Sequence, residues 1–435
     1  MPEIKSFGSP RFGPLALIKS SHSAMKDIFK NILCENINNG RSFYFVDLED
    51  VVAKHQNWIR KLPQIRPFYA VKCNTTDMVL RTLANLGTGF DCASQREIEI
   101  VLDIGVKPER IIFANPCKTI EALQYAKSVG VDLMTFDSEE ELYKIKQHFP
   151  EARVVLRIKT NDSAAKNPLS IKYGTEIADI EYLTQVARNL NLNLMGISFH
   201  VGSNTGGVEV YRQAIRDARY GFDVAKKYGF QMTLLDIGGG YPGNRYSNMI
   251  ETTFAEIAVT IKESISAYFN TDENIEIIAE PGRYFVASAF TLITKIVSRK
   301  VIAKNNAVMY YLMDGIYGAF ANGWCDFYNP ELIPLISEEE ERKRNQMVAT
   351  FWGPTCDSVD CVAKNIVYPE MKVGEWVFVK DMGAYSLVAG SKFNGFDIPP
   401  CIFALSVRTK TKMSLPLTPI ALTNNGATVV CHQRK

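Results

Sequence analysis

The chain has 435 residues, of which 46% are hydrophobic and 22% charged, the composition of an ordinary globular protein. Its 49 basic and 47 acidic residues leave a formal net charge of +2, which argues against a nucleic-acid-binding surface. The N-terminal residues lack the apolar core of a signal peptide, and no apolar stretch reaches the roughly 18–20 residues that span a membrane. Nine irregularly spaced cysteines favour a reducing compartment, and the absence of CxxC and HExxH motifs speaks against a metal site. We therefore expect a cytoplasmic protein that binds neither nucleic acid nor membrane.

Short apolar runs alternate with segments of helical periodicity between residues 67 and 285. The eight runs are PFYAVK (67–72), GTGFD (87–91), IIFANP (111–116), LMTFD (133–137), ARVVLR (152–157), LMGISFH (194–200), MTLLDIGGG (232–240) and IEIIAEPGR (275–283). Strands that alternate with helices and are apolar on both faces are typical of a parallel sheet. Eight of them predict an α/β fold with a closed (β/α)8 TIM barrel.

Most of these runs end in a residue able to take part in chemistry. The seven residues at or just past the run ends are Lys72, Asp91, Asp137, Arg157, His200, Asp236 and Glu280. One such residue is explained as a polar group at a strand–loop junction. Seven together predict an active site, because the C-terminal ends of the strands converge on one face of this barrel.

The sequence on either side of the barrel has a different pattern. Residues 41–50 form one strand-like run, and the region of about 286–410 holds several others that are separated by turn-rich loops rather than long helices. We expect an N-terminal extension over 1–40 and a barrel over 41–285 whose first strand joins the second domain. An antiparallel β-domain over 286–410 and a peripheral tail over 411–435 complete the predicted organisation.

Lys72 ends a run that is typical of a buried strand, where a solvated charge has no obvious place. Desolvation lowers the pKa of a lysine, and the neutral amine can attack an aldehyde. Lysine binds pyridoxal 5'-phosphate (PLP) as a Schiff base in this way. The alternative is a lysine that simply pairs with a carboxylate such as Asp91.

A PLP site also requires a phosphate cradle and a carboxylate opposite the pyridine nitrogen. Three glycines, Gly238, Gly239 and Gly240, directly follow a strand, and their backbone N–H groups can approach a phosphate closely. Glu280 stands at the eighth strand end, and Arg283 is near enough in sequence to meet the phosphate. His200 is placed to lie on the ring face, although a buried histidine with one backbone partner would look the same.

The glycine segment also fits the dinucleotide fingerprint GxGxxG through Gly238, Gly240 and Gly243. Pro242 interrupts this fit, and no acidic strand end follows about 20 residues further on. We therefore set NAD binding aside.

Seven segments together resemble the eukaryotic ornithine decarboxylase family, which has the alanine-racemase-like PLP fold. They are RPFYAVKCN, GTGFDCAS, SFHVGS, LLDIGGGYPG, AEPGRYFV, WGPTCDSVD and MGAYS with FNGF. The resemblance spans about residues 40–405. It implies a PLP barrel, a C-terminal β-domain and a homodimer with shared active sites. The implied reaction is decarboxylation of L-ornithine to putrescine, the first step of polyamine biosynthesis.

The resemblance assigns roles to barrel residues motif by motif. Lys72 corresponds to the Schiff-base lysine, and Glu280 to the partner of the pyridine nitrogen. Asp91 and Glu97 correspond to residues near the lysine and the ring, and His200 to the ring-stacking histidine. The phosphate ligands that it implies are Ser203, Gly238, Gly239, Gly240, Arg283 and Tyr385.

The resemblance also assigns roles outside the barrel. Cys356 corresponds to the cysteine that arrives from the partner subunit and returns a proton to Cα. Asp357 and Asp326 correspond to the carboxylates that hold the distal ammonium of the substrate. The family usually has tyrosine before the latter aspartate and histidine after it, whereas this chain has Cys325 and Phe327. Two carboxylates still indicate a diamino acid, because a buried cation needs an anionic partner.

Ornithine is the expected substrate, and a paralogous decarboxylase for lysine or another amino acid is the main alternative. Diaminopimelate decarboxylases normally continue the cysteine motif with glutamate, where this chain has Asp357. Antizyme inhibitors are non-catalytic relatives that have lost PLP residues, and the presence of Lys72 and Cys356 argues against that assignment. Antizyme is a possible partner through the segment around 120–145, where the charge pattern decides nothing.

Overall fold

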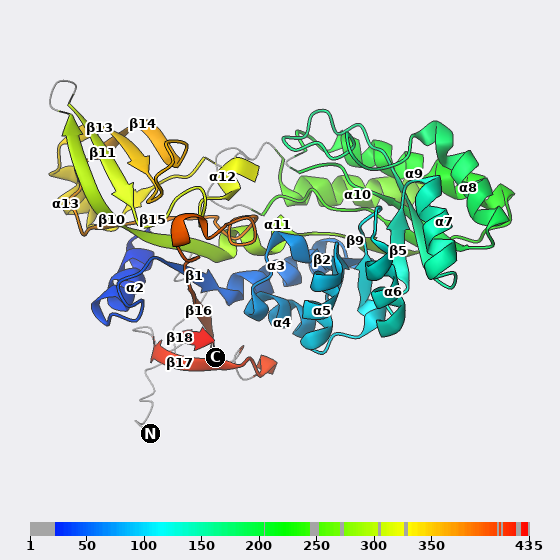
Figure 1. Ribbon diagram of the computed structural model, residues 1–435, viewed down its shortest axis with the longest axis horizontal. Coiled ribbons are helices and arrows are strands. Elements are labelled where there is room, and N and C mark those ends of the chain that lie inside the picture. The colour runs from blue at the N-terminus through cyan, green and yellow to red at the C-terminus, as the bar shows by residue number, and fades with distance from the viewer. Residues whose placement is uncertain are drawn as a thin grey trace. The chain divides into compact units, whose positions relative to one another are not determined.

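The computed structural model describes residues 22–203, 205–243, 252–269, 274–302, 306–325, 329–406, 409, 412–422 and 428–433. The chain divides into two compact units (Figure 1). The barrel unit comprises Ala53–Phe285, and the β unit comprises Met1–Val52 with Val286–Lys435. Helix α3 (Leu48–Lys61) leads from the first strand of the β unit into the barrel unit.

Eight parallel strands close into a barrel, which confirms the predicted fold. In order around the barrel they are β2 (Ile65–Ala70), β3 (Gly89–Cys92), β4 (Ile111–Phe113), β5 (Leu133–Phe136), β6 (Arg153–Ile158), β7 (Asn193–Phe199), β8 (Leu234–Asp236) and β9 (Glu276–Ala279). Strand β2 pairs with β9 and so closes the ring. A cluster of buried side chains from six strands, among them Phe68, Val155 and Ile278, packs together and helps to make the barrel a solid core.

Helices follow the strands in turn. They are α4 (Asp77–Asn85), α5 (Gln95–Asp103), α6 (Ile120–Val129), α7 (Glu139–His148), α8 (Ile180–Asn189), α9 (Glu209–Lys227), α10 (Phe254–Tyr268) and the short α11 (Arg283–Val286). Side-chain caps fix the starts of some of them: Thr119 Oγ1 accepts from Ala122 N–H at α6, and Thr253 forms a reciprocal capping box with Glu256 at α10.

The β unit contains a mixed sheet rather than a purely antiparallel one. Its strands are β1 (Phe43–Asp47), β10 (Phe290–Ile302), β11 (Ala307–Leu312), β12 (Ile333–Pro334), β13 (Gln346–Trp352), β14 (Cys361–Pro369), β15 (Trp376–Val379), β16 (Cys401–Ser406), β17 (Leu417–Leu422) and β18 (Thr428–Gln433). Most pairs are antiparallel, but β11 with β13 and β1 with β16 are parallel. The segment between β11 and β13 carries α12 (Asn322–Cys325) and α13 (Glu338–Arg342) and is long enough for such a crossover.

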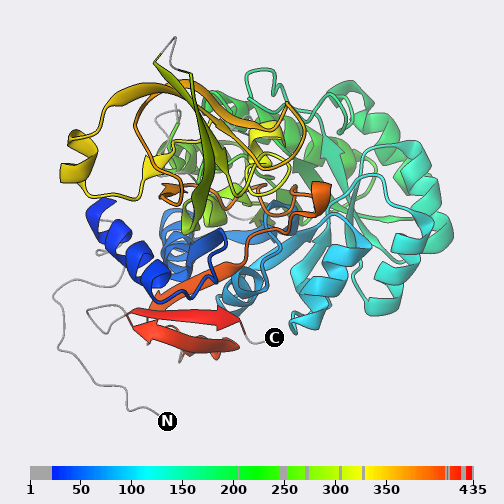
Figure 2. The same cartoon turned by 60° about the vertical axis from the view of Figure 1, so that its left-hand side comes forward.

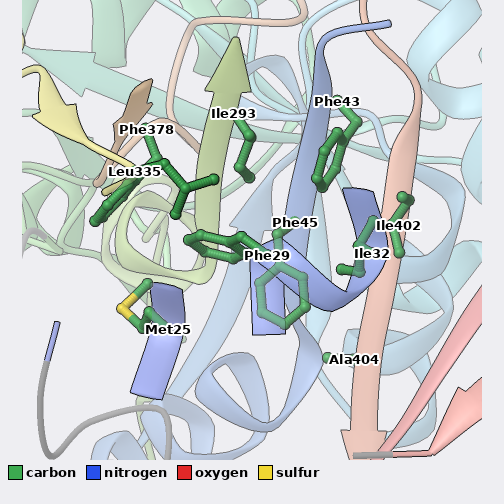
Figure 3. Close-up of a cluster of buried hydrophobic side chains, with 10 residues drawn as sticks. All are labelled: Met25, Phe29, Ile32, Phe43, Phe45, Ile293, Leu335, Phe378, Ile402 and Ala404. Atoms are coloured by element: carbon green, nitrogen blue, oxygen red, sulfur yellow. The ribbon is translucent and has the colours of Figure 1, made fainter. Parts of the chain in front are cut away.

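Strand β1 pairs with β10 and β16, and the helix before it supplies part of the same core. Helix α2 (His22–Cys34) buries Met25, Phe29 and Ile32 against side chains of β1, β10, β15 and β16 (Figure 3). The Phe29 ring lies edge-on to Phe45, with centroids 5.3 Å apart. Residues 22–34 are therefore an integral part of the β unit.

The last strands extend the sheet instead of forming a detached tail. Strand β18 pairs antiparallel with β16, and β17 pairs with β18, as the two red strands of Figure 2 show. The expectation of a peripheral tail was wrong in this respect. The apolar runs of these two strands are short, and Pro419 lies within β17, where the pairing with β18 shifts its register. Short runs and a proline both weaken the sequence signal for a strand.

Two structural checks bear on membrane and metal binding. Within the described ranges, no helix combines the length and apolar character needed to cross a bilayer. The same ranges contain no group of three or more His, Cys, Asp or Glu side chains arranged to hold a metal ion.

Candidate active site

Lys72 and Asp91 form an ion pair at the C-terminal ends of neighbouring strands. Lys72 lies in a 3₁₀ turn directly after β2, and its Nζ donates to Oδ2 of Asp91 in β3. The carboxylate is fully buried, whereas 39% of the lysine side chain is exposed. Asp91 Oδ1 is also buried and accepts no hydrogen bond from the described residues. The pair therefore places an accessible amine over a buried anion.

Glu97 lies in the first turn of α5 beside this pair. Its backbone N–H donates to Ser94 Oγ at 3.3 Å, and its Oε2 accepts from Ala93 N–H at 2.6 Å. This capping arrangement fixes the carboxyl group at the helix start. Burial raises the pKa of Glu97, and the negative charge of Asp91 adds to the effect, while the Ala93 N–H and Lys72 oppose it.

His200 follows β7 and is held in one tautomer. Gly202 N–H donates to Nδ1 at 3.1 Å, so the proton of the neutral ring is on Nε2. Burial, followed by the positive charges of Arg157 and Lys72, lowers the pKa of His200 well below its ordinary value. The imidazole is thus a neutral aromatic plane at physiological pH.

The glycine turn after β8 packs so closely against β7 that side chains are excluded. Gly238 and Gly240 have φ values of +60° and +99°, which favour glycine. A Cβ on Gly239 would lie 2.6 Å from His200 Nε2, and one on Gly240 would lie 2.8 Å from the Gly202 oxygen. The turn therefore presents bare backbone beside His200, as an anion-binding turn requires.

Arg283, the first residue of α11 after β9, brings a positive charge into the same region. Its Nη2 donates to Ser203 Oγ at 3.1 Å, and the residue is 8% exposed. Tyr241 and Tyr284, which follow the glycine turn and Arg283, both pack on the fully buried Trp58 at 4.9 and 5.5 Å between ring centroids. One aromatic cluster therefore supports both segments.

Glu280 and Asp236 bring two buried carboxyl groups together at the ends of β9 and β8. Each influences the ionisation of the other, and both lie near Asp91. Burial raises the pKa of Glu280 well above its ordinary value, with Asp236 and then Asp91 adding to the shift and Lys72 opposing it. The sequence placed Asp236 at a strand end, but its pairing with Glu280 was not foreseen.

A further segment of the site, the loop after β6, had no assigned role in the sequence analysis. Asn167 and Ser203 exchange two backbone hydrogen bonds, and Thr160 Oγ1 donates to the His200 oxygen at 3.0 Å. The buried Asp162 holds the loop in shape by accepting from Leu169 N–H and Ser170 N–H. This loop has no regular periodicity, so its docking on the His200–Ser203 segment left no signal in the sequence.

The β unit carries the other expected residues on separate loops. Tyr317 donates its hydroxyl proton to Oδ2 of Asp357, and Asn394 Oδ1 accepts from Cys356 N–H at 3.0 Å. The Cys356 side chain is exposed, and Tyr385 lies on the loop after β15 with φ of +56°. Asp326, with Phe327 beside it, lies outside the described residues.

Asp360 shapes the loop that carries Cys356 and Asp357. Its carboxylate is 1% exposed and accepts from Ile316 N–H at 2.8 Å and from both the backbone and the hydroxyl of Thr355. Gly315 and Gly353 lie against this carboxylate with no room for a Cβ. Asp360 thereby links the 314–321 and 353–357 loops, a role that sequence reasoning missed.

The barrel residues fit PLP by their chemistry. Lys72 offers an amine for the aldehyde, and Glu280 a carboxyl group for the pyridine nitrogen. Ser203, the glycine turn and the buried Arg283 offer donors and positive charge for the phosphate. Glycines at the turn are needed on steric grounds, which is consistent with close approach of a ligand to the backbone.

Comparison with known proteins agrees with this arrangement. Residues 48–287 match the family described as pyridoxal-dependent decarboxylase, pyridoxal binding domain. The chain is 43% identical over 396 residues to ornithine decarboxylase of Rattus norvegicus, with 87% of this chain and 85% of the relative covered. It is 42% identical over 392 residues to antizyme inhibitor 2 of Xenopus laevis, with the same shares covered.

A solved structure of the same fold is the arginine decarboxylase of Paramecium bursaria Chlorella virus. It superposes with a TM-score of 0.82 and 34% sequence identity, covering 87% of this chain and 100% of the viral one. The fold, the site and these similarities define a PLP-dependent decarboxylase, a carboxy-lyase of fold type III. Within that class, the chain belongs to the eukaryotic ornithine decarboxylase family.

Proposed function

We propose that the protein decarboxylates L-ornithine to putrescine and so serves polyamine biosynthesis. The observation that carries this proposal is the Lys72–Asp91 ion pair, which lies in one site with Glu97, His200 and Glu280. A barrel that had lost its cofactor would have no need to keep an accessible lysine over a buried carboxylate.

Each barrel residue has a role in this proposal. Lys72 would hold the aldehyde of the cofactor, and Asp91 would hold the lysine ammonium whenever the amine is released. Glu280 would serve as the partner of the pyridine nitrogen, and His200, neutral because of its lowered pKa, would lie on the ring. When bound, PLP supplies an electron sink for the electron pair that remains after CO2 leaves.

The phosphate is assigned to residues at the ends of β7, β8 and β9. Ser203 and Arg283 are already joined by a hydrogen bond, and the glycine turn presents backbone N–H groups beside them. We assign Tyr385, from the β unit, as a further phosphate ligand. A buried arginine suits this task because its guanidinium stays charged and binds phosphate oxygens through two N–H groups.

The β unit contributes the proton donor and the two carboxylates that bind the substrate's distal ammonium. The Cys356 thiol gives a proton to Cα, and the exposed position of this side chain within its own chain is consistent with a role in a partner subunit's site. Asp357 holds the distal ammonium of ornithine together with Asp326. We therefore propose a homodimer with shared active sites.

Product analysis tests the substrate. Purified protein supplied with PLP would receive equal concentrations of ornithine, lysine, arginine and leucine, and the amines would be separated and measured. Putrescine should dominate, and an Asp357→Asn variant should lose the preference for a cationic side chain while still binding PLP. Dominant cadaverine or agmatine would rule out ornithine as the preferred substrate.

A second candidate function is antizyme binding without catalysis, because antizyme inhibitor 2 of Xenopus laevis is as similar to the chain as ornithine decarboxylase is. Measurements of amine production, PLP content and antizyme binding on one preparation distinguish the two functions. A protein that binds antizyme but forms no amine and retains no PLP would be the non-catalytic relative. An active decarboxylase that also binds antizyme through the 120–145 segment would combine both properties.

A further inference from the structure

Asp236 is a buried carboxylate next to the proposed phosphate turn. It is the last residue of β8, where it lies between Ser198 of β7 and Ile278 of β9. The residue is 1% exposed, and Oδ1 accepts from Gly238 N–H at 2.9 Å. Its Oδ2 is buried as well, and no N–H or O–H of the described residues donates to it.

Glu280 is the neighbour that can satisfy this second oxygen. The two segments are joined through the backbone, because Glu280 N–H donates to the Gly238 oxygen at 2.7 Å. The two carboxyl groups influence each other directly. A proton held between them would give Asp236 Oδ2 its hydrogen bond and would remove one of two adjacent buried charges.

Charges from the surrounding strands favour one proton on the pair rather than none. Asp91 on β3 adds a third negative charge, whereas Arg157 on β6 and Lys72 after β2 offset part of it. The nearby Tyr241 hydroxyl is buried, and the ring of His200 is neutral. Burial raises the pKa of Asp236, and Gly238 N–H and Glu280 only partly oppose this shift.

We propose that Asp236 is a positioning residue that ties the glycine turn to Glu280 and shares one proton with it, so that the pair keeps a single negative charge to face the ring nitrogen of the cofactor. This inference rests on the proposed function, because it takes Glu280 as the partner of that nitrogen. The ring nitrogen of such a cofactor is already protonated in neutral solution. The pair would therefore hold it through charge, with the shared proton on Asp236 and the negative charge on Glu280.

The consequence is a defined protonation state of the pair. In Asp236→Asn the amide oxygen can still accept from Gly238 N–H, but Glu280 stands alone and ionises at lower pH. The shared proton is then lost, whereas the negative charge that faces the ring nitrogen remains.

The first experiment measures binding of pyridoxine 5'-phosphate to cofactor-free protein at about pH 7.5, above the phosphate pKa of about 6. This ligand has no aldehyde, so the chemistry of Lys72 does not enter. We expect Asp236→Asn to bind within about threefold of the wild type, because it keeps the hydrogen bond to Gly238 and the charge of Glu280. Asp236→Ala, which loses the hydrogen bond to Gly238, should bind about tenfold more weakly.

Infrared difference spectroscopy gives a readout that is independent of binding. The cofactor-free wild type at neutral pH should show the C=O stretch of a protonated carboxyl group, and both Asp236→Asn and Glu280→Gln should lose that component. Asp314→Asn is the matched control, because Asp314 is a buried carboxyl group of the β unit. Its replacement should remove only the C=O signal of Asp314 and leave that of the Asp236–Glu280 pair unchanged.

The outcomes separate the two proposals. A wild type that binds the ligand, with the infrared band unchanged in Asp236→Asn and the affinity unchanged in Asp236→Ala, would overturn the role of Asp236 and leave the proposed function standing. A wild type that binds neither this ligand nor PLP would overturn the proposed function itself. Loss of the infrared band in both Asp236→Asn and Glu280→Gln would support the shared proton, whichever amino acid the enzyme prefers.

Discussion

Arg283 and Ser203 are 80 residues apart in sequence, yet Nη2 of the arginine donates a hydrogen bond of 3.1 Å to Oγ of the serine. Arg283 is the first residue of α11, four residues after the end of β9, and Ser203 lies four residues after the end of β7. The glycine turn after β8 lies between these two strand ends in the order of the barrel. The segments after three consecutive strands thus bring a charge, a hydroxyl group and bare backbone to one edge of the barrel.

The two side chains should differ in their effect on cofactor affinity. Arg283→Ala removes charge-assisted hydrogen bonds and should weaken PLP binding about 10- to 100-fold, whereas Ser203→Ala should weaken it about 2- to 10-fold. Titration of cofactor-free protein with PLP measures both effects. Arg153, which pairs with Asp132 at the opposite ends of the barrel strands, is a matched control, and its replacement should leave PLP affinity unchanged. Equal affinities for Arg283→Ala and wild type would remove the arginine from the phosphate site.

Lys72 should be the residue that borohydride links covalently to PLP. Reduction of the wild type in the presence of PLP should add the mass of the cofactor to the peptide that contains Lys72, because reduction makes the lysine–cofactor bond permanent. Lys72→Ala should show no label there and no decarboxylation. The control is Lys159→Ala, since this lysine also directly follows a barrel strand, β6, but pairs with the exposed Glu176. A label on another lysine in the wild type would contradict the assignment of Lys72.

The barrel was predictable because its signal is local. Each strand run carries its own apolar pattern and each is followed by a helical period, so the strand ends and their polar residues could be read one at a time. Lys72, Asp91 and Glu280 belong to this group. What the runs do not encode locally is the register around the closed ring, and that register is what brings Asp236 to Glu280.

The β unit was less predictable because its contacts are distant in sequence. Strand β1 pairs with β16, more than 350 residues away, as the hydrogen bond from Ser406 N–H to Glu49 also illustrates. The loop contacts of Asp360 depend on Gly315 and Gly353, which belong to no periodic pattern. Propensity alone does not determine such pairings, since tertiary packing selects them.

Tyr317 should affect the binding of substrate by Asp357, the carboxylate that we propose holds the distal ammonium, without affecting the binding of the cofactor. Its hydroxyl group, followed by Val359 N–H, lowers the pKa of Asp357 below its ordinary value. Tyr317→Phe removes one hydrogen bond and should raise KM for ornithine about 2- to 10-fold, with PLP affinity unchanged. Steady-state kinetics and PLP titration on the same preparation test both statements. A variant with unchanged KM would show that Asp357 does not depend on Tyr317 for its orientation.

Asp314 should give the β unit a pH-dependent stability. Burial raises its pKa from 3.8 to about 7, and the nearby Asp360 adds to the shift, while the N–H groups of Ala319 and Gly315 oppose it. The native protein therefore keeps a proton on Asp314 that the unfolded chain releases near pH 4. The free energy of unfolding should fall as pH rises from about 4 to about 7, by up to ~4 kcal/mol from this group.

Replacement by asparagine removes that dependence. Asp314→Asn retains an oxygen that can accept from Gly315 and Ala319, so the fold should survive, but its stability should vary less with pH than that of the wild type. Urea unfolding at pH 5 and pH 7.5 measures the difference between the two proteins. Asp217→Asn controls for the loss of one carboxylate, since Asp217 is a half-buried residue of α9 in the barrel unit, where it accepts from Gln213. If Asp314→Asn and the wild type lost stability in parallel over this range, Asp314 would have the same protonation state in the native and unfolded proteins, and its proposed contribution to the pH dependence would be wrong.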